Sequence, residues 1–162
     1  MTVAAESQIR GDIERIGGIS TVGILLLFGI LFRSIRMLGL GLAPLWFGSA
    51  CAIIATHLVF GEIHGLTLAF GTSLLGVGID YAEHYFSHFA LTPELGAKHV
   101  MRAVWPGLWM GALTTILGFS GLGVTGFPGV RQIAFFSAVA IVGALVGTRW
   151  LLPPWMPVGH ER

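Results

Sequence analysis

The sequence has few charged residues, which make up only 10% of its 162 positions, against roughly 25% in an average soluble domain. Apolar residues make up 54%, and the mean hydropathy is +0.82. This composition excludes an ordinary soluble domain and predicts an integral membrane protein. The formal net charge is +1, and no basic patch is present, so we expect no nucleic-acid partner.

Cysteine is also scarce. Cys51 is the single cysteine and lies in an apolar run, so it cannot form a disulfide within the chain and does not indicate a redox compartment. Glycine, in contrast, is abundant at 24 residues, which suits close contact between helices in a bilayer. Because lipid leaves no backbone group unpaired, we expect an all-α bundle of transmembrane helices.

The apolar runs predict three parts of the chain. Residues 1–16 have isoleucines at helical spacing among charges and read as an amphipathic pre-membrane helix. They lack the basic start and small-residue cleavage site of a signal peptide. A transmembrane domain at 17–157 follows, and 158–162 form a cytoplasmic tail. Runs of about 20 apolar residues fit the hydrocarbon thickness, and five are expected, at 17–32, 38–60, 66–89, 105–124 and 130–151.

The distribution of basic residues predicts the orientation. Five spans place the termini on opposite sides. With the N-terminus outside, the cytoplasmic side receives Arg33, Arg36, Lys98, Arg102, Arg149 and Arg162, and the outside receives Arg10, Arg15 and Arg131. The positive-inside rule therefore favours a multi-pass inner-membrane protein with an external or periplasmic N-terminus and a cytoplasmic C-terminus. A native chain that begins outside with no preceding span is unusual, so we expect a piece of a longer protein.

Asp80 is the main candidate functional residue, because it lies in the second half of the apolar run 66–89. An ionised carboxylate in hydrocarbon is costly, and such residues usually occur where protons or ions move. His84 and His88 follow at intervals of four residues and share its helix face. A histidine's unperturbed pKa suits proton transfer. The alternatives are that Asp80 is a structural anchor and that the histidines are interfacial side chains with solvated tips.

Further candidates surround this residue. Tyr81 offers a hydroxyl on a neighbouring face. Gly71, Gly76 and Gly78 let another backbone approach closely, either to permit a helix shift or for packing alone. Thr114 and Thr115, in the next span, either line a polar path to Asp80 or hydrogen-bond back onto their own helix.

Three runs together carry a family resemblance. Residues 71–81, GTSLLGVGIDY, resemble the fourth-helix signature of resistance-nodulation-division (RND) exporters, especially the mycobacterial-membrane-protein-large (MMPL) branch and related predicted lipid exporters. Residues 111–119 and 127–132 resemble that family's fifth helix and the turn into its sixth. The resemblance covers residues 6–157. It implies that the five spans are helices two to six of one six-helix half-bundle, a fold similar to the sterol-sensing module.

The resemblance also implies a function. It predicts one transmembrane module of a proton-driven exporter of hydrophobic or lipid-like substrates, with Asp80 and Tyr81 as the proton relay. The shared helix face, and not the resemblance, adds His84 to this relay. The family's porter domain and second half, which holds another Asp-Tyr pair, have no counterpart in this sequence. The expected partners are therefore protons, membrane lipids, and either the remainder of a larger transporter or further copies of the chain. No cofactor is implied.

Two other classes of function stay open. The chain could be a sterol-sensing-like module that binds lipid and regulates a partner. It could also be a metal-dependent membrane enzyme, because His84 and His88 have the spacing of a histidine box, although only His99 lies nearby. A serine motif at 118–121 lacks a histidine base in any later span. We expect neither catalytic activity nor a metal site.

Overall fold

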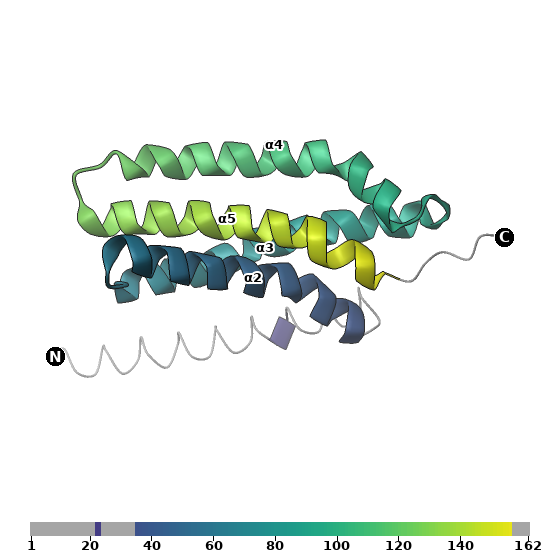
Figure 1. Cartoon of the computed structure of the whole chain (residues 1–162), viewed down its shortest axis with the longest axis horizontal. Coiled ribbons are helices and arrows are strands. Elements are labelled where there is room, and N and C mark those ends of the chain that lie inside the picture. Colours follow the sequence, from purple (N-terminus) through teal and green to yellow (C-terminus); the bar gives the residue numbers. More distant parts are fainter. Residues whose placement is uncertain (1–21, 24–34, 157–162) are drawn as a thin grey trace. The chain divides into compact units, whose positions relative to one another are not determined.

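The computed structural model describes residues 22–23 and 35–156, and their side chains except at 35–38, 72–76 and 93. The described residues are helical throughout, apart from short turns (Figure 1). The elements are α2 (Ile35–Phe60), α3 (Gly65–Leu91), the 3-10 helix η1 (Pro93–Leu95), α4 (Ala97–Gly123) and α5 (Pro128–Trp155). The predicted segments 1–16 and 158–162, and nearly all of the predicted span 17–32, lie outside the described residues.

The chain divides into two units, Met1–Gly39 and Leu40–Arg162. Of the first unit, the structure describes only residues 22–23 and 35–39. The second unit contains α2 from Leu40 onward together with α3, α4 and α5.

The expected class of fold is confirmed in its general form. The described part of the chain is all-α, and three of its helices are long and apolar enough to cross a membrane: Gly39–Phe60, Ala97–Gly123 and Pro128–Trp155. Many large apolar side chains remain exposed on them, for example Trp46, Leu58 and Trp150. In water this surface would be unfavourable, whereas in a bilayer it faces a solvent as apolar as itself. The length and apolar composition of these helices therefore indicate a membrane protein.

The helix boundaries correct two predictions. The helix of the fourth predicted span begins at Ala97 instead of residue 105, and Pro106 lies inside it. The connection between α3 and α4 covers only residues 92–96 and ends at Gly96, whose positive φ of 74° suits glycine. The fifth predicted span, 130–151, is also longer in the structure, because α5 continues through Pro153 to Trp155. Each proline removes one backbone hydrogen bond, but the last carbonyls of a helix have no helical partner in any case.

Helix α5 is the centre of this unit, because it packs against both α3 and α4. It also contacts α2 at very short range. A methyl group added at Gly48 would lie 2.5 Å from the Ala140 carbonyl oxygen, and one at Gly143 would lie 2.7 Å from the Gly48 Cα. One turn further, a methyl group at Gly147 would lie 2.9 Å from the Pro44 Cα. Small residues at four-residue intervals on both helices thus allow the two backbones to touch.

Candidate functional site

Asp80 and Tyr81 lie on different faces of α3, since adjacent helix positions are separated by about 100°. Tyr81 is buried, with 6% of its surface exposed. Asp80 is exposed on the outer surface of the described bundle. The carboxylate is therefore not enclosed by α2, α4 or α5, and its surroundings in a membrane depend on what covers this face of α3.

The Tyr81 hydroxyl has no hydrogen-bond partner among the described residues, although it is buried. Such unsatisfied buried hydroxyls are uncommon in native proteins. The neighbouring Tyr85, one turn later, differs in this respect: its hydroxyl donates to the Ala97 carbonyl oxygen at 3.2 Å. Tyr85 therefore ties α3 to the start of α4, whereas Tyr81 keeps a free hydroxyl beside Asp80 in the sequence.

The expected row of polar side chains on α3 is present. His84 and His88 are exposed, as Asp80 is, and the two imidazole rings lie 5.7 Å apart, centroid to centroid, in an edge-to-face arrangement. Within the described part of the chain, no group of three or more His, Cys, Asp or Glu side chains is placed to hold a metal ion. We refer to Asp80, His84 and His88 as the polar row.

The two threonines of the expected polar path are engaged with their own helix. The hydroxyls of Thr114 and Thr115 both donate to the Gly111 carbonyl oxygen, at 2.8 and 2.9 Å. This local bond is the usual arrangement for threonine inside a helix. It satisfies both hydroxyls without any contribution from the polar row.

The glycines singled out on α3 are packing positions for side chains. A methyl group at Gly71 would collide with the Phe136 ring, and one at Gly78 would lie 2.8 Å from a Leu45 methyl carbon. No backbone atom is among these contacts. Gly76 belongs to residues 72–76, whose packing lies outside the described residues. The backbone contact expected at these glycines occurs instead between Gly48 and Gly143, on α2 and α5.

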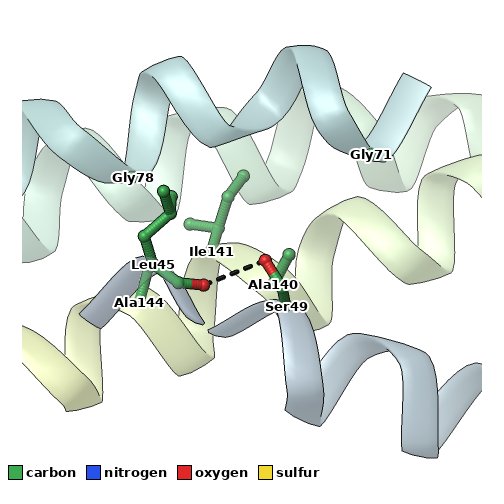
Figure 2. A pocket seen from close by; sticks show the side chains of 7 residues that line it. All are labelled: Leu45, Ser49, Gly71, Gly78, Ala140, Ile141 and Ala144. Atoms are coloured by element: carbon green, nitrogen blue, oxygen red, sulfur yellow. Dashed lines mark hydrogen bonds between the residues drawn. The ribbon is translucent and has the colours of Figure 1, made fainter. Parts of the chain in front are cut away.

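Figure 2 shows the interior beside these glycines, where α2, α3 and α5 meet around a void of about 10 Å³. The Leu45 side chain points toward Gly78, and the Ser49 hydroxyl donates to the Leu45 carbonyl oxygen at 2.9 Å. A single water needs roughly 10–15 Å³ of such volume and several polar partners. This apolar void is therefore too small for a water chain, and Asp80, His84 and His88 lie outside it, on the exposed face of α3.

A buried glutamine holds the opposite end of the bundle together. The sequence pattern alone did not indicate a role for it. Gln132, on the first turns of α5, is 1% exposed. Its side-chain oxygen accepts hydrogen bonds from the His64 backbone N–H at 2.9 Å and the Thr67 hydroxyl at 2.7 Å. Its amide donates to the Glu62 carbonyl oxygen at 2.7 Å. The turn between α2 and α3 is thereby fastened to α5.

The only sequence signal for these hydrogen bonds is a neutral polar residue near the start of an apolar helix. Such a residue must find partners if it is buried, but the sequence does not reveal which ones, because the contacts span 65 to 70 positions.

Comparisons with known proteins identify no relative: no family model, no curated protein and no solved structure matches the chain. The resemblance to RND exporters therefore stays a prediction that depends on the three sequence runs.

Proposed function

We propose that the chain is a transmembrane module of a proton-driven exporter of the RND/MMPL type, and that Asp80 is the group that binds the proton. The observation that supports this most is the position of Asp80. It lies on a 27-residue helix within an apolar bundle, on a face that the described helices leave exposed.

The energetic cost of the Asp80 charge depends on what covers that face. A charged side chain facing hydrocarbon near the bilayer centre costs about 2.5–3.5 kcal/mol even on the lowest scales. No salt bridge or hydrogen bond from another described residue offsets this cost for Asp80. We infer that a further transmembrane bundle, either a second half of the transporter or a second copy, covers the polar row in the working assembly.

Such an arrangement couples proton binding to movement. When Asp80 takes up a proton from the external side, its charge disappears and its attraction to polar groups on the covering bundle weakens. The two bundles then shift, and release of the proton to the cytoplasmic side restores the charge. His84 lies one turn along the polar row and is the first group placed to accept the released proton, with His88 beyond it.

The buried Tyr81 hydroxyl supports a supplementary role. Because it has no partner among the described residues, it is free to donate to a carboxylate or water brought near by the covering bundle. Cargo recognition is assigned to the porter domain of the complete transporter, and we propose hydrophobic or lipid-like substrates because of the family branch. The proposed location is the inner membrane, with the start of α4 and the end of α5 on the cytoplasmic side.

Proton flux tests this proposal. The complete transporter containing this chain is reconstituted in vesicles with an internal pH indicator, and proton movement is started by adding substrate. We expect Asp80→Asn to abolish the substrate-dependent flux, because the amide cannot take up the proton. Glu83→Gln is the matched control, since it removes a carboxylate three residues away on the same helix and should leave the flux intact. Equal flux through wild type and Asp80→Asn would refute the proposal.

A further inference from the structure

A cleft separates the start of α4 from the end of α5. The two helices run antiparallel, so these ends lie beside each other (Figure 1). The cleft has a volume of about 540 Å³, within the roughly 300–1,000 Å³ of small-molecule sites. None of its residues belongs to the polar row. In the sequence, its basic residues indicate only the orientation of the chain.

Positive charge dominates the walls of this cleft. Lys98 and Arg102 come from α4, where a spacing of four residues puts them on one face, and Arg149 comes from α5. Among the residues that the structure describes, no acidic side chain lines the cleft. Neither Lys98 nor Arg102 has an ion pair or hydrogen bond with another residue that the structure describes. Three cations gathered without a counter-charge repel one another, and a bound anion would relieve that repulsion.

Aromatic side chains give the cleft an amphipathic character. The Arg149 guanidinium carbon lies 4.1 Å from the centroid of the Trp105 ring, within the distance of a favourable cation–π contact. This contact holds the charged group in one place. Trp150, also in the wall, is strongly exposed. Tryptophan near the end of a membrane helix usually lies at the level of the lipid headgroups.

The position selects among anionic ligands. Both helices are long and apolar enough to span a membrane, so their ends lie at the interface, where phospholipid phosphates are concentrated. Basic pockets between transmembrane helices are known to hold anionic headgroups. A soluble phosphate compound would need no neighbouring apolar surface, whereas a lipid would place its acyl chains along the exposed tryptophan.

We propose that this cleft binds the headgroup phosphate of an anionic phospholipid, which comes from the leaflet at this end of α4 and α5. Lys98 and Arg102 contact the phosphate oxygens, Arg149 supplies a third charge from its position on Trp105, and Trp150 packs against the upper acyl chain. The proposal is independent of proton transport, because none of these residues belongs to the polar row.

The test compares lipid selectivity in variants of the full chain. The protein is placed in nanodiscs of mixed phosphatidylglycerol and phosphatidylcholine, and the lipids retained after detergent extraction are counted by native mass spectrometry. We expect the wild type to retain phosphatidylglycerol preferentially. Arg102→Gln and Lys98→Gln should each lower that preference about fivefold, from about 1 kcal/mol per cation near an anionic surface. Arg149→Lys should weaken it less, since the charge stays and only the planar stacking is lost.

Arg131→Gln is the matched control, because it removes one positive charge from the exposed start of α5, at the opposite end of that helix. It should leave the preference unchanged. An equal loss in Arg131→Gln would mean that net charge alone attracts the lipid and would overturn the proposal. Equal retention of the two lipids by wild type would also overturn it. Displacement of the lipid by soluble glycerol phosphate at similar concentration would assign the site to a soluble ligand instead.

Discussion

Replacement of Gln132 by methionine should strongly destabilise the described bundle. The two side chains have similar volume, so the change removes hydrogen bonds without creating a large cavity. It leaves the buried Thr67 hydroxyl, the His64 N–H and the Glu62 carbonyl without their partner. A buried unsatisfied polar group costs about 1–3 kcal/mol. His64 and Glu62 are exposed, so water replaces part of their loss, and we expect a total cost of about 2–4 kcal/mol.

A double-mutant cycle shows whether the loss of the Gln132 hydrogen bonds causes the destabilisation. Thr67→Val removes the buried hydroxyl that Gln132 accepts from. In the Gln132→Met background this second change should cost much less than in the wild type, because the hydroxyl has already lost its partner. The free energy of unfolding is measured by titrating the purified chain with denaturing detergent in mixed micelles. A Gln132→Met variant within about 0.5 kcal/mol of wild type, the margin within which independent sites add, would refute this reasoning. Strictly additive effects in the cycle would refute it too.

Two further predictions concern packing and topology. Gly48→Ala should lower stability by about 1–3 kcal/mol, because the added methyl meets backbone atoms of α5 that cannot rotate away. Gly118→Ala is the control: a methyl group there has no neighbouring atom within 4 Å, so stability should stay unchanged or rise in the same titration. An equal loss in both variants would contradict the packing account. In a Cys51→Ala background, Glu94→Cys places a thiol in the exposed loop before α4. It should resist an impermeant thiol reagent in intact cells, and rapid labelling would reverse the proposed orientation.

The helices were largely predictable from sequence, because apolar runs of transmembrane length leave few alternatives to a helix in a bilayer. The start of α4 was not. The helix extends past Pro106 toward its N-terminus, because a membrane helix tolerates an interior proline when its neighbours or water satisfy the freed carbonyl. The polar row was also predictable, since a spacing of four residues on one helix determines a shared face.

Contacts between helices were much less predictable. The glycines chosen on α3 were those beside Asp80, whereas a close backbone approach occurs between Gly48 and Gly143, which are 95 positions apart in the numbering. Similarly, Lys98 and Arg149 line one cleft although they come from different helices. Helical periodicity indicates which residues share a face, but it does not indicate which face of another helix lies opposite. The hydrogen bonds of Gln132 could not be predicted for the same reason.

Export by living cells tests the central proposal most directly. Cells that depend on the complete transporter containing this chain are given the wild-type, Asp80→Asn or Glu83→Gln version, and surface or medium levels of the exported substrate are measured at matched protein abundance in the membrane. The proposed role of Asp80 predicts that Asp80→Asn lowers export to the level of cells without the transporter, while Glu83→Gln supports normal export. Normal export by Asp80→Asn at equal abundance would contradict it.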